Sequence, residues 1–298
     1  MKKLMTFALV LCMCLGLTAC GSADGKEVLT IAYAPNESTD QSADARHGLA
    51  SDLEALLGVE VEEIQATDYN AIVEALRTGQ ADMAYMGALA VALANERAGA
   101  TPIAMKAVNG DKNQAVYHSL LITSSANTDI NSIQDIKGKT IAFVDPESTS
   151  GNLVPTSDII NAFPDENLTS NQLHTNGAFF EAVSYSGKHQ AGLQAVIRND
   201  VDVVPISDQI LQSEIDNGNA SADDVKIIHE SGPIPAEAFV VSQDMDPERA
   251  AQIKEFLINY DNADYFKMVI KEESARFVEA SIDDYQSVIE LNQTLNNE

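Results

Sequence analysis

The stretch AIVEALRTGQADMAYMG, residues 71–87, indicates how the chain is organised, because a related stretch, AGLQAVIRNDVDVVPIS, occurs at residues 191–207. Each stretch has apolar residues at helical spacing, then a short polar turn, then a mostly apolar run with the length of a buried strand. The rest of the chain does not superpose in the same way. The chain therefore uses one helix–turn–strand unit once in each of two α/β lobes, and it is not a tandem repeat.

The remaining chain alternates between strand and helix patterns. Strand patterns fall at residues 28–34, 59–64, 81–86, 117–123, 139–144, 182–185, 201–206, 225–228 and 238–242. Helix patterns fall at residues 48–57, 69–76, 88–98, 151–162, 190–198, 247–259, 264–270 and 282–295. This order predicts an α/β protein with two lobes, each a mixed, mostly parallel sheet flanked by helices, and a ligand cleft between the lobes. We expect lobe one to comprise residues 26–117 and 238–298, and lobe two residues 118–237.

The composition is that of an acidic globular protein. The chain has 298 residues, with 45 Asp and Glu against 18 Lys and Arg, and a formal net charge of -27. This length is enough for a sizeable core and two domains. The acidic excess disfavours nucleic acid as a partner and disfavours electrostatic binding to anionic lipid, so we assign most of the carboxylates to the solvated surface.

The N-terminus has the pattern of an export signal. Two lysines precede an apolar run, residues 5–17, that is too short to span a bilayer as a stable helix. The following Leu-Thr-Ala-Cys, which ends at Cys20, resembles the bacterial lipobox and implies cleavage before Cys20 and lipidation of its thiol. Residues 1–19 are then a signal peptide and residues 20–27 a lipidated tether. The alternatives are an ordinary secretory signal with a chance cysteine, and an uncleaved membrane anchor.

The sequence offers no recognised catalytic or metal-binding pattern. Cysteines occur only at positions 12, 14 and 20, so the exported part has no disulfide and no thiol for catalysis. The histidines lack metal-ligand spacing, and neither a P-loop nor a Gly-x-Ser-x-Gly motif is present. We expect no cofactor, no metal and no catalysis. An exported hydrolase of phosphate esters is the alternative from another class, and it would need clustered metal ligands or an activated nucleophile.

Three hydroxyl residues mark the candidate site. Ser148, Thr149 and Ser150 follow the strand predicted at residues 139–144 and open the next helix. The simpler interpretation is a capped helix start without a ligand, but capping needs only one hydroxyl. Three hydroxyls and the N–H groups of a helix start together form a donor-rich concavity for a tetrahedral oxyanion. The chain has no Lys or Arg from residue 140 to residue 187, so we expect these donors to act without a basic residue.

The run DIKGKTIAFVDPESTSGNLVP, residues 135–155, resembles the signature of the phosphate/phosphite/phosphonate-binding proteins of ABC importers, which have the type II periplasmic-binding-protein fold. Segments at residues 67–87, 117–123, 186–208 and 230–242 resemble the same family in the same order. The resemblance covers nearly the whole exported chain. It implies an extracytoplasmic lipoprotein that is held at the cell membrane by its lipid anchor only, works as a monomer, and delivers its ligand to an ABC permease and its ATPase.

The resemblance also implies roles for single residues. It assigns ligand oxygens or closure of the cleft to Ser148, Thr149, Ser150, His189, Tyr69 and Tyr117. Simpler alternatives are an exposed histidine at a helix start for His189 and ordinary helix packing for Tyr69.

Two acids bear on the ligand's substituent. Glu237 falls where aminoalkylphosphonate binders carry an amine-binding carboxylate, and its partner falls at Asp208 or Gln209, between which the sequence does not choose. If both acids face the cleft, they favour a cationic amine on the ligand; if they face outward, phosphite, phosphate or a neutral alkylphosphonate is favoured. The same fold also leaves open a different oxyanion, an organic acid, or a ligand-presenting sensor.

Overall fold

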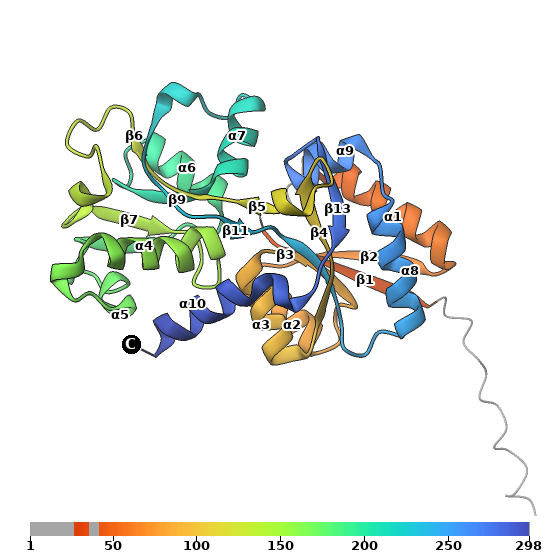
Figure 1. The fold of residues 1–298 in the computed structure, drawn as a ribbon. Helices are drawn as coiled ribbons and strands as arrows, with labels where there is room; N and C mark the ends of the chain where they lie inside the picture. Colours follow the sequence, from red (N-terminus) through yellow and green to blue (C-terminus); the bar gives the residue numbers. More distant parts are fainter. Residues whose placement is uncertain (1–26, 36–41, 298) are drawn as a thin grey trace, which may run out of the picture.

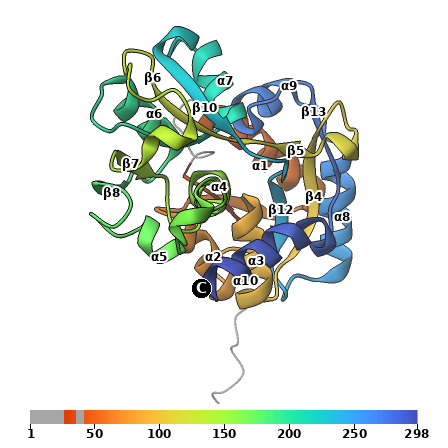
Figure 2. The same cartoon turned by 60° about the vertical axis from the view of Figure 1, so that its left-hand side comes forward.

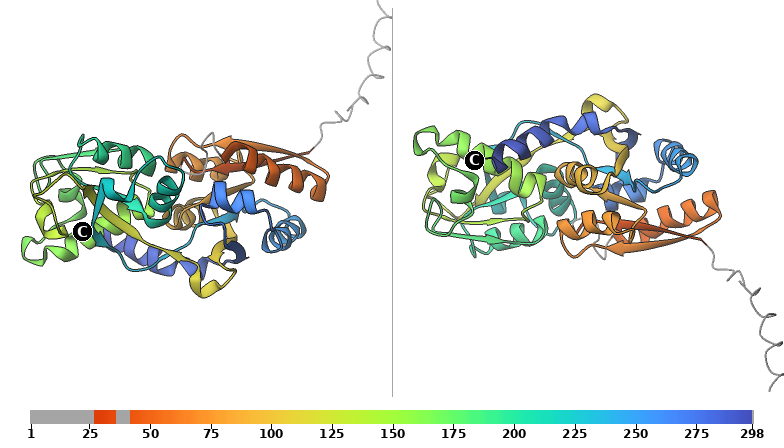
Figure 3. Two further views of the ribbon diagram at one scale, coloured as in Figure 1. Left: turned by 90° about the horizontal axis from the view of Figure 1, so that it is seen from above. Right: turned by 90° about the horizontal axis from the view of Figure 1, so that it is seen from below.

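The computed structural model describes residues 27–35 and 42–297, which form two α/β lobes side by side (Figure 1). The predicted signal peptide, most of the tether and Cys20 lie outside the described residues. Views from above and below show the lobes lying end to end (Figure 3). None of the helices in the described part of the chain is both long enough and apolar enough to span a bilayer.

The first lobe is built on a six-stranded sheet with the order β13-β4-β12-β3-β1-β2. Its strands are β1 (Val28–Tyr33), β2 (Glu60–Gln65), β3 (Met83–Met86), β4 (Thr101–Val108), β12 (Ala238–Val241) and β13 (Ala275–Glu279). Its main helices are α1 (Ala43–Leu57), α2 (Tyr69–Arg77), α3 (Ala88–Ala98), α8 (Pro247–Ile258), α9 (Ala263–Tyr265) and α10 (Gln286–Asn296).

The second lobe contains two smaller sheets (Figure 2). Its strands are β6 (Ser119–Ser124), β9 (Val204–Ser207) and β10 (Val225–Glu230), and the pair β7 (Thr140–Phe143) and β8 (Ala182–Tyr185). Its helices are α4 (Val154–Ala162), α5 (Ser170–Leu173), α6 (His189–Ile197) and α7 (Asp208–Asp216). A parallel bridge between Ile141 and Val203 connects the two sheets.

The large sheet is mixed, but less of it is parallel than the sequence analysis expected. Only the pairings of β1 with β2 and with β3 are parallel. Strand β12 pairs antiparallel with β3 and β4, and β13 pairs antiparallel with β4. The difference arises because β12 joins the sheet only after the chain has returned from the second lobe, and it then runs against its neighbours.

The repeated helix–turn–strand unit has the same local device in both lobes. The Asp82 carboxylate accepts a hydrogen bond of 2.7 Å from the Thr30 N–H on β1. The Asp202 carboxylate accepts bonds of 2.8 Å from both the N–H and the hydroxyl of Thr140 on β7. Each aspartate thus ties the start of its own strand to the neighbouring strand, which explains an acid inside an otherwise apolar run.

The chain crosses between the lobes at a two-stranded ribbon. Strand β5 (Val116–Tyr117) pairs antiparallel with β11 (Ile234–Pro235). The strand predicted at residues 117–123 is therefore two strands, β5 and β6, with His118 between them. The ribbon places Tyr117 at the first crossing and brings the second crossing to within two residues of Glu237.

Among the elements of five or more residues, β4, β13 and α7 were not predicted from the sequence. The interior of β4 contains Pro102 and Lys106, residues that argue against a central strand, yet six of its eight positions are buried. Its pairing with β12 shifts register close to Pro102, so the missing N–H falls at an irregularity. These elements matter because β4 and α7 both carry residues that lie at the site.

Helix α10 packs against elements of both lobes. It packs against α3 and against the turn Thr149–Leu153 of the second lobe. One core cluster accordingly contains Leu89 of α3, Leu153 of that turn, and Val288 and Leu295 of α10. The end of the chain therefore contributes apolar packing to both lobes. Figure 1 shows the ribbon of α10 at the junction of the two lobes.

Candidate functional site

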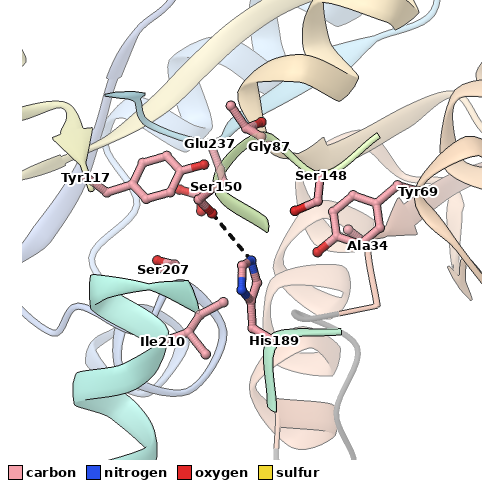
Figure 4. A pocket seen from close by; sticks show the side chains of 11 residues that line it. Ala34, Tyr69, Gly87, Tyr117, Ser148, Ser150, His189, Ser207, Ile210 and Glu237 are labelled. Carbon is pink, nitrogen blue, oxygen red and sulfur yellow. Dashed lines mark hydrogen bonds between the residues drawn. The ribbon is translucent and has the colours of Figure 1, made fainter. Parts of the chain in front are cut away.

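A small, partly enclosed cavity lies between the lobes, and its empty space, together with the open solvent at its mouth, is about 310 Å³. Its lining consists of Ala34, Tyr69, Gly87, Tyr117, Ser148, Thr149, Ser150, His189, Ser207, Ile210 and Glu237. No Lys or Arg belongs to this lining. The close-up shows the hydroxyls of Tyr69 and Tyr117 and the His189 ring directed toward the space beside the serines (Figure 4).

The turn at Ser148 serves both the helix and the cavity. Ser148 is the N-cap of the turn Thr149–Leu153, and its Oγ accepts the Gly151 N–H at 3.1 Å. Capping uses Ser148 only as an acceptor, so its proton remains for donation into the cavity. A Cβ at Gly151 would lie 2.4 Å from the Cβ of Val144, and glycine is therefore the residue that lets this turn close. The structure confirms the cap at Ser148, and this cap leaves the hydroxyl proton available to a ligand.

Thr149 links the two lobes directly. Its Oγ1 accepts the Leu89 N–H, at the start of α3, at 2.8 Å. The Tyr117 side chain hydrogen-bonds those of Ser150 and Thr149. Burial raises the pKa of Tyr117 well above its usual range, so this phenol keeps its proton. The hydroxyls thus form a connected group of neutral donors.

His189 is fully buried, not exposed at its helix start. Its Nε2 lies 3.4 Å from the Ser150 Oγ, and the ring also hydrogen-bonds the Pro205 backbone. Burial lowers the pKa of His189 to about 4, which leaves the imidazole neutral at pH 7. A neutral imidazole has one N–H, so with that N–H on the Pro205 carbonyl the ring accepts from Ser150, and it donates to a ligand only when protonated.

Several helix starts open onto the cavity. Tyr69 and His189 are the first residues of α2 and α6, and Gly87 and Ser207 are the N-caps of α3 and α7. Ser148 begins the turn that leads into α4. All five residues line the cavity. Each helix start carries a partial positive charge, so their convergence favours an anion although the whole chain is strongly acidic.

Ser207 is a site residue that the sequence analysis missed. Its side chain is 2% exposed and lines the cavity, and its Oγ has no hydrogen-bond partner among the described residues. The hydroxyl does not cap α7. The repeated stretches contained a signal for it, because Ser207 aligns with Gly87 when the two stretches are superposed, and both residues are helix N-caps in the cavity wall.

Glu237 lines the cavity, but its carboxylate already has a cationic partner. Nζ of Lys106 on β4 lies 2.6 Å from Oε2 of Glu237. The same ammonium donates to the side-chain oxygen of Gln209. The sequence analysis did not place Lys106 near the site, because it did not predict β4.

Asp208 is not among the residues that line the cavity. Its Oδ1 accepts the Gln209 N–H at 2.8 Å, and its own N–H donates to the His118 carbonyl. Burial raises the pKa of Asp208, and hydrogen bonds from the two neighbouring backbones oppose that shift. The structure therefore brings Glu237 to the cavity without a second acid beside it in the lining.

The described residues contain no cluster of His, Cys, Asp or Glu that could hold a metal ion. The ring nitrogens of His174, for example, make hydrogen bonds within the protein: Nε2 lies 2.8 Å from Oδ1 of Asn152, and Nδ1 lies 2.8 Å from the Ser170 carbonyl.

The two-lobed α/β fold is that of solved type II periplasmic binding proteins, as expected from the sequence. Residues 31–285 match the family described as the periplasmic substrate-binding protein of phosphonate ABC transporters. The chain belongs to this family. Its members are extracytoplasmic components of transporters, not enzymes.

Individual relatives agree with this assignment. The chain is 28% identical over 254 residues to the phosphate-import protein PhnD of Mycolicibacterium smegmatis, a match that covers 82% of this chain and 78% of that protein. It is 28% identical over 224 residues to the phosphonates-binding periplasmic protein of Escherichia coli, covering 74% of this chain and 62% of that protein. PhnD1 of Prochlorococcus marinus in complex with methylphosphonate has the same fold, with a TM-score of 0.76 at 19% identity, covering 91% of this chain and 99% of that one.

Proposed function

We propose that this chain captures a phosphorus oxyanion in the cavity between its lobes and presents it, in the closed form, to the permease of an ABC importer. The observation that carries the proposal is the convergence of five helix or turn starts and at least four buried hydroxyl side chains on a cavity without a basic residue in its lining. A tetrahedral anion with several oxygens uses such donors from many directions at once.

Ser148, Thr149, Ser150, Tyr69 and Tyr117 are the proposed ligands of the oxyanion. A hydrogen bond to a charged acceptor contributes about 1.5–3 kcal/mol, and micromolar affinity needs about 8 kcal/mol. Five such bonds contribute about 7.5–15 kcal/mol, so bonds near the strong end of this range are needed once the entropy of binding is subtracted.

His189 is proposed to act in two states. It orients the Ser150 hydroxyl in the empty site, and it becomes a donor to the ligand when the anion raises its pKa and protonates the ring.

Binding and release are proposed to occur by rotation of the lobes about the β5–β11 ribbon, with residues 26–117 and 238–298 moving against residues 118–237. Two contacts support this division because they cross the cleft near the site. The Leu89 N–H donates to Thr149, and NH1 of Arg97 lies 2.9 Å from Oε1 of Glu147. An anion held by Ser148 and Tyr69 would add further bonds between the lobes and so favour closure.

Attachment to the membrane is proposed to occur through a lipid on Cys20, with no part of the exported chain crossing the bilayer. The support is the Leu-Thr-Ala-Cys sequence after the short apolar run. Metabolic labelling with palmitate should mark the wild type but not Cys20→Ser. Labelling of the variant, or its absence in the wild type in a host that processes lipoproteins, would contradict the anchor.

A thermal-shift panel tests the ligand class. Phosphate, phosphite and methylphosphonate are compared with sulfate and acetate, on the wild type and on a variant with Ser148→Ala, Thr149→Val and Ser150→Ala. A ligand at 100 times its dissociation constant should stabilise the wild type by about 2.7 kcal/mol, and the variant should show no shift. A thermal shift with sulfate or acetate alone would contradict a phosphorus oxyanion as the ligand and would favour another oxyanion or an organic acid.

A sensor protein would use the same closed form but would present the ligand to a membrane receptor and not to a permease. If the chain works in transport, cells with the permease and its ATPase should take up the ligand, and this uptake should require the chain. Normal uptake in cells that lack the chain would contradict a role in transport.

A further inference from the structure

Lys106 is a buried cation directly behind the cavity wall. It lies on β4, where its N–H donates to the Glu237 carbonyl at 3.2 Å, so the pairing of β4 with the start of β12 fixes the two residues side by side. The Lys106 side chain is only 6% exposed, and that of Glu237 is 11% exposed. The two charges are therefore held together by the sheet itself and are largely shielded from water.

The Lys106 ammonium has three neighbours that hold it in place. Nζ lies 2.6 Å from Oε2 of Glu237, donates to the side-chain oxygen of Gln209, and lies 5.8 Å from the centre of the Tyr117 ring. A carboxylate, an amide oxygen and an aromatic face are what an ammonium group prefers around it. This is also the environment that a ligand's amine would need.

The ammonium of Lys106 changes what the wall at Glu237 can bind. An unpaired carboxylate there would attract an amine on the ligand, whereas a carboxylate paired with a buried ammonium carries no net charge toward the cavity. A second ammonium near Glu237 would be repelled by Lys106 at short range in a poorly screened environment. Moving Lys106 aside would leave its own charge buried without a partner.

We propose that Lys106 determines the specificity of this site: its ammonium occupies the position of a ligand amine on Glu237, so the protein takes phosphorus oxyanions without a cationic substituent. Phosphate, phosphite and small alkylphosphonates belong to this class, and aminoalkylphosphonates do not. The inference rests on the proposed function, because it concerns the substituent of the same oxyanion.

Isothermal titration of the purified protein with two ligands of equal size tests this. Propylphosphonate and 2-aminoethylphosphonate have the same number of heavy atoms, and they differ in a methyl group against an ammonium. The wild type should bind propylphosphonate at least tenfold more tightly. Lys106→Met should shift the ratio of the two affinities at least tenfold toward 2-aminoethylphosphonate, because the ammonium of this ligand can then pair with Glu237 in place of Lys106.

The double variant Lys106→Met with Glu237→Gln is the matched control. It lacks the same ammonium but offers no carboxylate, so it should show no gain for the amine. A gain as large as in the single variant would contradict the role of Glu237. A wild type that prefers 2-aminoethylphosphonate, or an unchanged ratio in Lys106→Met, would overturn the inference, and the wild-type ratio decides even if the single variant does not fold.

Binding of methylphosphonate and phosphate distinguishes a failure of this inference from a failure of the proposed function. If neither binds the wild type, the proposed function fails. If methylphosphonate binds while neither larger ligand binds the wild type or Lys106→Met, the size of the cavity and not its charge sets the limit, and only the inference on Lys106 fails.

Discussion

Replacing His189 by glutamine should change the pH dependence of stability in the ligand-free protein. Burial lowers the pKa of His189 to about 4, against about 6.5 in an unfolded chain. Between these values the unfolded chain binds more protons than the folded one, so this residue makes stability rise with pH. Its contribution is fully present above pH 6.5 and is lost as the pH falls to 4. A shift of this size corresponds to about 3 kcal/mol at 1.36 kcal/mol for each pKa unit.

Urea unfolding followed by circular dichroism at pH 7, 6, 5 and 4 measures this difference. The free energy of unfolding of the wild type should fall by about 3 kcal/mol more than that of His189→Gln over this range. His47→Gln is the control, because the His47 side chain is 84% exposed, and its curve should follow that of the wild type. Parallel curves for the wild type and His189→Gln would refute the argument that the ring is buried and neutral.

Three further substitutions test the turn, the cavity wall and the repeated strand device. Gly151→Ala should lower the free energy of unfolding by about 1–3 kcal/mol, because its Cβ meets Val144 at 2.4 Å; an unchanged urea midpoint would contradict this close approach. Ser207→Ala should weaken methylphosphonate binding about tenfold in calorimetry without lowering apo stability, since its Oγ has no partner among the described residues; unaltered affinity would remove it from the site. Asp202→Asn should lower the free energy of unfolding in urea by about 1–3 kcal/mol, because the Asp202 carboxylate accepts two hydrogen bonds from Thr140. A free energy of unfolding equal to that of the wild type would show that these bonds do not stabilise the fold.

Local patterns predicted the parts of the fold that depend on neighbouring residues. Helix α3 has the predicted bounds, and α2 begins at the predicted residue, Tyr69, where the Asp68 side chain caps it by accepting the Ala71 N–H. The strand β4 was missed because Pro102 and Lys106 interrupt its apolar pattern. Its assignment depends on β12 and β13, which flank it from distant parts of the chain.

The candidate site divides in the same way. The hydroxyls of Ser148, Thr149 and Ser150 are adjacent in sequence, so their common direction at one turn could be expected from the helix start that follows. The place of Ser207 could not be predicted in this way, because the hydroxyl of a serine before a helix usually makes a capping bond. The structure shows that the Ser207 hydroxyl makes no such bond and lies in the cavity wall.

Two α/β lobes and a hydroxyl-rich turn were predictable from the chain, because the repeated helix–turn–strand unit and the three hydroxyls before Gly151 each involve residues close in sequence. The charge at the other end of the cavity was not predictable, because it depends on residues far apart in sequence. Lys106 meets Glu237 because β4 and β12 pair in the sheet, and Gln209 joins them from the second lobe. Such a meeting depends on strand order and on how the lobes close, and neither leaves a periodic pattern in the sequence.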